Sequence, residues 1–494
     1  MTTDPDDLKV LEEASAAVSS RSPDLARLDA VLIKLPRPTP LRGMIQSVRA
    51  GALHAQNRSA QAVAAINEGL RLLPNHPVPQ LIASGIFTFT GAPQRGADLW
   101  MQASVTSPEL ARGTDPYMLD ALIGRLYENG DRTRGDRLSA RMAEIGFSTA
   151  LASARSHAAL ARTREAVQNQ QLEEALRGIA LISNPADLEV LFVDRRYEDL
   201  WPRIAEWGGT DFDPVSRRYL EELRGDWVAA GDLNTATEYA RRLSLLRADA
   251  AVVELFLPLF DEVRVGAPQD GMEFLAPVVA RSMIVVGRHE DAYRLLEKVA
   301  AAYPEDAGGN SLNIDAAFVS LAMEQANWPE VISSADRFLR AAEALGPSIN
   351  RSPLIAVRSA LACAYSRTAQ MEDARLPAAE VLLAANVMPG SALNLHLCRG
   401  DTAAAQALIV ARLEDVVTRD WALRFVQAPG PRRGTPLELL TGPTADQVRA
   451  APEVIAAANK HGRILPAALA RSLPDGFDPL EIRPAPQPLD PNAI

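Results

Sequence analysis

Apolar residues recur along most of the chain at helical spacing, and small or polar residues interrupt them about every thirty to forty residues. The pattern is clearest at residues 286–296, VGRHEDAYRLL, where Gly287 separates two apolar segments and Pro304 ends the second one. Apolar side chains spaced by three and four residues are typical of α-helices, and proline cannot continue the helical hydrogen bonds. The pattern therefore predicts antiparallel helix pairs joined by short turns.

Small residues follow these turns at a constant offset. Ala62 stands five residues after Asn57, and Ala292 stands five residues after Gly287. A small side chain is needed where two helices cross most closely, because a larger one would push them apart. Alanine holds the same position after the turns at Ala92, Gly231, Ala369 and Gly400, and weaker copies of the pattern turn at Gly130, Asn169, Arg195 and Asn327.

This pattern resembles the tetratricopeptide repeat family, whose units of about 34 residues carry a small residue early in the second helix and a closing proline. The resemblance covers most of residues 40 to 420 and is most specific in the units that turn at Asn57 and Gly287. It implies an all-α fold, a right-handed α-solenoid of antiparallel helix pairs. Such solenoids have a long concave surface that usually binds another polypeptide.

Breaks in the pattern divide the predicted solenoid. Residues 264–271, RVGAPQDG, indicate an inserted loop, and a run of proline and glycine follows residue 427. Six prolines after residue 473 indicate an extended or disordered tail. We therefore predict capping helices at 1–40, repeats at 41–263 and 264–427, capping helices at 428–473, and a proline-rich tail at 474–494.

Charge argues against nucleic acid as the partner. The chain has 51 basic and 62 acidic residues and a formal charge of −11, so no surplus positive charge could displace counterions from phosphates. All but four of the basic residues are arginine. Together with the abundant alanine, this suggests a GC-rich bacterial genome.

The sequence favours a cytoplasmic location. It contains no apolar segment of the length that a signal peptide or a membrane span requires. Cys363 and Cys398 are its only cysteines, and two cysteines in so long a chain do not indicate a disulfide framework. Cys363 stands among apolar residues, where we expect a small buried side chain.

No residue cluster carries a catalytic signature. The six histidines have no metal-ligand spacing, and phosphate loops, nucleophile elbows and dinucleotide fingerprints are missing. We therefore predict no catalytic residue, no metal and no cofactor. An α/α-toroid enzyme, which also consists of helix pairs, is a less favoured alternative. Sugar-processing toroids line a central pocket with aromatic residues and paired acids, whereas the 26 aromatic residues of this chain are scattered.

The first helix of each pair should line the concave surface. Counting back from the turns places a partly aromatic apolar patch and one arginine there, and we predict that they bind a protein or peptide: Ile82, Ile86, Phe89, Tyr117, Tyr127 and Arg281. The same counting also gives Phe274 and Ile284 in the unit of Arg281, and Ala356, Ser359, Cys363 and Ser366 in the unit that turns at Ala369. The alternatives are that the apolar residues fill the seam between repeats, that the groove senses a small molecule or peptide, or that the tail occupies it.

Overall fold

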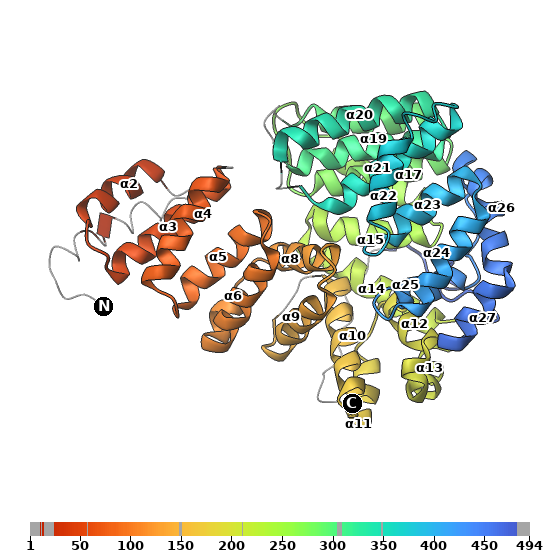
Figure 1. Ribbon diagram of the computed structural model, residues 1–494, viewed down its shortest axis with the longest axis horizontal. Helices are drawn as coiled ribbons and strands as arrows, with labels where there is room; N and C mark the ends of the chain where they lie inside the picture. The colour runs from red at the N-terminus through yellow and green to blue at the C-terminus, as the bar shows by residue number, and fades with distance from the viewer. Residues whose placement is uncertain are drawn as a thin grey trace. The chain divides into compact units, whose positions relative to one another are not determined.

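The computed structural model describes residues 10, 12–13, 24–56, 58–147, 151–209, 211–303, 309–346 and 349–481 (Figure 1). Successive helices pack as antiparallel neighbours, and within the described residues the only β pairings are two isolated bridges. The predicted all-α fold of paired helices is therefore confirmed. The chain forms two compact units, one of residues 1–148 with 347–349 and one of residues 149–346 with 350–494.

The first unit is a stack of helix pairs in which α3 packs on α4, α5 on α6 and α8 on α9. Each pair also contacts the next one through α5 and α8. Its helices are α2 (Leu25–Lys34), α3 (Pro40–Ala55), α4 (Ser59–Leu72), α5 (Pro77–Phe89), α6 (Pro93–Thr106), α7 (Pro108–Arg112), α8 (Pro116–Glu128) and α9 (Arg132–Glu144).

The second unit has more pairs. It begins with α10 (Ala152–Gln168), α11 (Leu172–Ile179), α12 (Pro185–Val193), the 3-10 helix η1 (Arg195–Leu200), α13 (Trp201–Gly208), α14 (Asp213–Ala230), α15 (Leu233–Leu245), α16 (Asp249–Phe256) and η2 (Leu257–Phe260). It continues with α17 (Met272–Val285), α18 (His289–Ala300), η3 (Gly309–Ser311), α19 (Leu312–Glu324), α20 (Trp328–Leu345), α21 (Arg351–Arg367) and α22 (Arg375–Leu383). It ends with α23 (Pro389–Arg399), α24 (Thr402–Glu414), α25 (Arg419–Val426), α26 (Pro436–Ala450) and α27 (Pro452–His461).

Turn chemistry explains where the helices end. Gly231, Gly287 and Gly400 follow their helices with φ of 64°, 82° and 72°, the left-handed region that glycine adopts without strain. Ala326, beside the weaker turn at Asn327, and Ala369 take the same conformation, with φ of 51° and 60°. Asn57 and Pro304 lie outside the described residues. Ala92, Gly130 and Asn169 separate paired helices as predicted, whereas Arg195 begins the 3-10 helix η1.

The alanines after the turns lie where the paired helices meet. Ala62, Ala97, Ala236, Ala292 and Ala405 have no exposed surface. Each is in the first half of the second helix of its pair. This position confirms that the small residue in the repeat is a packing requirement.

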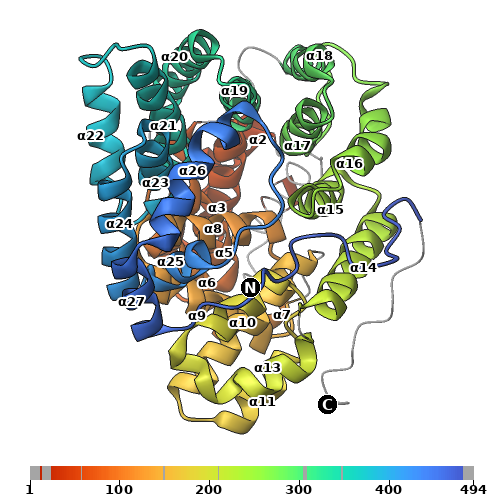
Figure 2. The same cartoon turned by 90° about the vertical axis from the view of Figure 1, so that its right-hand side faces the viewer.

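The last helices of the second unit pack against its first helices. α12 contacts α25, and Val193 shares a hydrophobic core with residues of α23 to α27. The guanidinium carbon of Arg463 lies 3.9 Å from the ring centroids of both Phe192 and Trp201. In Figure 2 the helices of this unit follow one another round a closed path, with α17, α19, α21 and α23 inside and α18, α20, α22 and α24 outside.

The division into units differs from the predicted one. A loop does occupy residues 261–271, but it lies within the second unit. Phe260 before the loop and Met272 after it are buried in one core cluster, which holds the two flanking segments together. The predicted C-terminal capping segment contains α26 and α27, and the predicted N-terminal cap contains α2.

Candidate binding groove

A groove of about 670 Å³ runs along the inner helices of the second unit. α17, α19, α21 and α23, each the first helix of its pair, supply most of the lining, and α15 and the start of α26 complete it. The apolar lining is Leu245, Phe274, Pro277, Val278, Ala316, Ala317, Val319, Leu321, Met323, Pro353, Ala356, Val357, Ala360 and Leu437. The polar lining is Arg241, Ser244, Glu273, Arg281, Asn313, Ser320, Glu324, Ser359, Ser391, Asn394 and Arg433.

Charged side chains connect the walls of this groove. Arg281 on α17 is 47% exposed and donates through Nε to Glu324 on α19, at 2.8 Å. The other carboxylate oxygen of Glu324 accepts from the Thr435 hydroxyl, also at 2.8 Å. Both oxygens of this carboxylate are therefore engaged, and the bond from Thr435 fixes the segment before α26 against α19.

Arg433 attaches the same segment to α15. Its side chain is only 6% exposed and donates to the Ser244 carbonyl at 2.6 Å and to the Ser244 hydroxyl at 2.8 Å. Asp249 Oδ2 lies 3.5 Å from its Nε. Burial lowers the pKa of Arg433, and the nearby Arg281 guanidinium lowers it further. The buried charges thus neutralise one another and hold the segment in place.

The predicted apolar patch of the first unit is partly corrected. Ile86 is 1% exposed within the core formed by α3, α4 and α5, so its prediction as a surface contact is wrong. Its position on α5 faces the neighbouring pair, where the apolar side chain is needed for packing. Ile82 is half-buried against the same core.

Phe89 is half-buried and belongs to a small aromatic and cationic cluster. The His54 ring stacks on it with centroids 5.9 Å apart, and the Arg125 guanidinium lies 5.3 Å from its centroid. Burial lowers the pKa of His54. The arrangement can present an apolar face beside a positive charge.

The two predicted tyrosines both lie on α8. The Tyr127 hydroxyl donates to Asp136 on α9 at 2.6 Å, and its ring covers Gly135. Tyr127 is therefore directed toward α9, whereas Phe89 is on α5. The side chain of Tyr117 lies outside the described residues.

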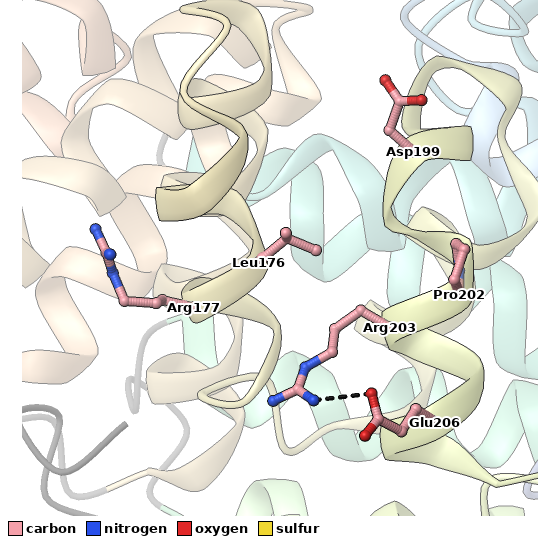
Figure 3. A pocket seen from close by; sticks show the side chains of 6 residues that line it. All are labelled: Leu176, Arg177, Asp199, Pro202, Arg203 and Glu206. Atoms are coloured by element: carbon pink, nitrogen blue, oxygen red, sulfur yellow. Dashed lines mark hydrogen bonds and ion pairs between the residues drawn. The ribbon is translucent and has the colours of Figure 1, made fainter.

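A second hollow, of about 600 Å³, lies between α11 and α13 (Figure 3). Its lining is Leu176, Arg177, Asp199, Pro202, Arg203 and Glu206. Arg203 pairs with Glu206 at 2.9 Å, and Arg177 pairs with Glu174 at 2.6 Å. These pairs are between residues of one helix, and only Leu176 and Pro202 contribute apolar side chains to the lining. The groove along α17 to α23 is therefore the better candidate site.

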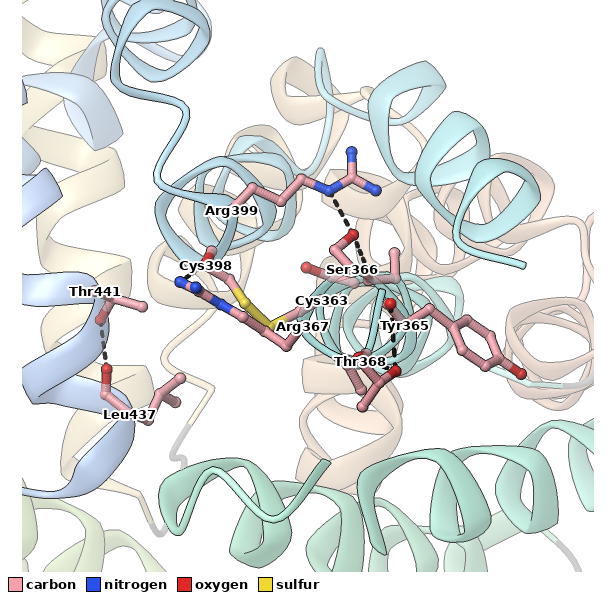
Figure 4. The surroundings of a disulfide bond; sticks show 12 residues. Cys363, Tyr365, Ser366, Arg367, Thr368, Cys398, Arg399, Leu437 and Thr441 are labelled. Carbon is pink, nitrogen blue, oxygen red and sulfur yellow. Dashed lines mark hydrogen bonds between the residues drawn. A yellow bond between two sulfur atoms is a disulfide. The ribbon is translucent and has the colours of Figure 1, made fainter. Parts of the chain in front are cut away.

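Cys363 on α21 and Cys398 on α23 form a disulfide (Figure 4). Cys363 is buried, as expected. The disulfide was not expected, and it forms because the separation of 35 residues is about one repeat, which brings the cysteines to adjacent inner helices with Cα atoms 5.9 Å apart. Arg399 donates to the Ser366 hydroxyl at 2.9 Å, and Arg367 donates to the Cys398 carbonyl. The disulfide therefore fixes two helices that line the groove.

The positions counted back from the predicted turns include part of the groove lining. Phe274, Arg281, Ala356 and Ser359 line it, as the count back from the turns predicted for the first helices. Ile284 and Cys363 from the same count are buried, and Ser366 is not among the lining residues. The contribution of α19 was missed because the unit turning at Asn327 has a weak pattern. Arg433 was missed because it follows a proline and glycine break that carries no repeat signal.

Within the described residues, no three His, Cys, Asp or Glu side chains are grouped closely enough to hold a metal ion. None of the described helices combines the length and the apolar character that crossing a membrane requires.

Comparisons with known proteins add no argument to the geometry described above. No protein-family model matches the sequence, and no curated protein matches it. A solved structure described as Naa15/Naa10 bound to HypK-THB is similar over 85% of this chain and 70% of that chain, with 14% sequence identity and a TM-score of 0.26. At this identity and TM-score, the similarity says nothing about function.

Proposed function

We propose that this protein is a non-enzymatic scaffold that holds a segment of a partner protein in the groove along α17, α19, α21 and α23. The observation that carries the proposal is the groove itself, in which consecutive inner helices offer apolar side chains beside isolated polar ones. A peptide crossing them would bury apolar side chains and meet hydrogen-bonding groups such as Asn313, Ser320 and Asn394.

The carboxylates of the groove support binding rather than catalysis. Glu273 accepts a hydrogen bond from the Tyr303 hydroxyl at 2.6 Å, and Glu324 is held by Arg281 and Thr435. A general acid or base must exchange its proton with a substrate, and these carboxylates are engaged by fixed groups of the protein. An α/α-toroid enzyme is therefore the less favoured interpretation.

Net charge supports a protein partner. The formal charge of −11 would repel nucleic acid unless a strongly basic surface compensated for it. The cytoplasmic location expected from the sequence is not part of the proposal, because a disulfide is typical of oxidising compartments.

A photo-crosslinking amino acid at Ala356 tests the groove. Ala356 is exposed on α21 and lines the groove, whereas Ala407 is exposed on the outer helix α24 and provides a matched control. In extracts of the source cells, we expect a discrete crosslinked protein at Ala356 and not at Ala407. The Ala356→Arg variant should lose that protein, while Ala407→Arg should retain it. Equal crosslinking at both positions would contradict the proposal.

A small-molecule sensor is the second candidate. A volume of about 670 Å³ lies within the range of ligand pockets. This function predicts that a metabolite raises the melting temperature of the unaltered chain and has less effect on Ala356→Arg. A thermal-shift screen in which no compound distinguishes the two chains would exclude it for the compounds tested.

A further inference from the structure

Residues 474–481 have neither helix nor strand and lie against α14 and α15. Side chains of these helices donate to the main-chain carbonyls of the segment. The Tyr239 hydroxyl donates to the Pro479 carbonyl at 3.0 Å, and Arg224 donates to the Asp478 carbonyl at 3.2 Å. Arg224 also donates to the Glu481 carbonyl, and Arg217 donates to the Asp475 carbonyl.

One side chain anchors the segment. Phe477 is 8% exposed and belongs to the core cluster that contains Tyr219, Leu220 and Tyr239. The Arg224 guanidinium lies 5.1 Å from the centroid of its ring. Leu480, in contrast, is 38% exposed. The segment is therefore held by its main chain and one aromatic side chain.

This division of contacts is typical of peptide recognition. Every peptide has carbonyl acceptors, so they provide affinity for any sequence, and a pocket for one side chain provides specificity. The donors belong to the folded helices. Arg217 and Arg224 are seven residues apart on α14 and therefore lie on the same face, about two turns from each other.

The residues just before the segment are bound differently. Leu469 and Ala470 are buried in the core formed around α12, and Arg471 donates to both carboxylate oxygens of Glu189, at 3.0 and 3.2 Å. Residues 463–471 are thus part of the core of the second unit. The segment 474–481 follows this attachment and makes its own contacts with α14 and α15.

We propose that the face formed by Arg217, Arg224, Tyr239 and the Phe477 pocket is a peptide-binding site, occupied here by the chain's own residues 474–481. Its partner is a polypeptide segment with the same chemistry as PDGFDPLE. In this sequence the phenylalanine has an aspartate on each side, and each aspartate is next to a proline. The partner segment displaces residues 474–481 and takes over the hydrogen bonds from α14 and α15. This site is separate from the groove and does not rest on its function.

A labelled peptide of residues 472–481, SLPDGFDPLE, tests the site by fluorescence anisotropy with the full chain. The unaltered chain should bind it weakly because its own segment fills the site. Phe477→Ala releases that segment, so this chain should bind the peptide about tenfold or more tightly. Adding Arg224→Ala should remove the gain. Leu480→Ala is the matched control and should behave like the unaltered chain.

Hydrogen exchange in the unaltered chain provides a second measurement that does not depend on a variant. Excess unlabelled peptide should accelerate amide exchange at residues 475–481, and a peptide with alanine in place of the phenylalanine should not. The proposal is wrong if the Phe477→Ala chain does not bind the peptide and the peptide does not change amide exchange in the unaltered chain. Residues 474–481 are then a fixed part of the fold. A dimer formed by exchange of this segment between copies would overturn the assignment to a different partner.

Discussion

The two compact units differ in how far apart in sequence their contacting residues are. In the described part of the first unit, side-chain hydrogen bonds join residues at most 37 positions apart, as between Arg141 and Ser104. In the second unit, Arg164 pairs with Asp420 across 256 positions, and Arg471 pairs with Glu189 across 282. A stack with neighbour contacts gains stability repeat by repeat, whereas contacts between its ends make the repeats of the second unit fold together.

The Asp420→Ala variant should show the largest loss of stability, because Asp420 joins the two ends of the second unit. Its carboxylate is buried and pairs with Arg164 and, at 2.8 Å, with Arg196. Arg196 also pairs with the fully buried Asp194 at 2.7 Å. Asp420→Ala leaves buried guanidinium charge with one fewer partner, so we expect a loss of about 3–5 kcal/mol in the unfolding free energy of the second unit. Urea unfolding followed by hydrogen exchange and mass spectrometry measures each unit separately.

The first unit provides the control for this prediction. Asp98 pairs with Arg134 at 3.0 Å, but its side chain is 56% exposed. Asp98→Ala should cost less than about 1 kcal/mol because solvent screens an exposed pair. If Asp420→Ala costs no more than Asp98→Ala, the contacts between the ends of the second unit do not stabilise it.

The same difference explains what the sequence could predict. Turns and crossing positions such as Gly287 and Ala292 follow from local spacing, and so does the groove position of Arg281. The partners Arg164 and Asp420 have no local signal, because each is one charged residue on a helix and only the closed path brings them together. Arg433 and Phe477 were missed for a related reason, since they lie in segments without periodicity.

The disulfide is a further contact that only the second unit has among the described residues, and it joins two of its repeats. Cys363→Ala with Cys398→Ala removes a cross-link that closes a loop of 35 residues. Loop-closure entropy predicts a loss of about 3–4 kcal/mol in the unfolding free energy. Urea unfolding should show this loss in the second unit, and reductant should destabilise the unaltered chain and not the double variant. Equal effects of reductant on both chains would show that the cross-link contributes nothing.

Gly69 in the first unit and Gly178 in the second each stand where two helices cross closely, so the same substitution can be compared in both units. A Cβ atom at Gly69 on α4 would overlap Ser47 Oγ and lie 3.0 Å from the Gly43 carbonyl oxygen. A Cβ atom at Gly178 on α11 would overlap Thr163 Oγ1. Each Gly→Ala change should cost about 1–3 kcal/mol from overpacking.

Hydrogen exchange should show that the loss of stability stays local in the first unit and spreads through the second. Gly69→Ala should increase hydrogen exchange mainly in α3 and α4, whereas Gly178→Ala should increase it across the second unit, including α25. Ser47→Ala should restore part of the loss from Gly69→Ala because it removes the overlapping hydroxyl. Exchange that rises only locally for Gly178→Ala would contradict cooperative folding of the second unit.

The smallest expected effect is a dependence on pH. Burial lowers the pKa of His54 in the first unit and of His396 in the second. A histidine with a lowered folded-state pKa binds protons more readily when unfolded, so stability is unaffected well above about pH 6.5 and falls as the pH drops below that value. His54→Gln should therefore flatten the pH dependence of exchange in α3 to α5 between about pH 7 and 5. His396→Gln should do so throughout the second unit, because its repeats unfold together. A first unit whose pH dependence also changes throughout, rather than near His54, would remove the distinction between a locally coupled stack and a closed one.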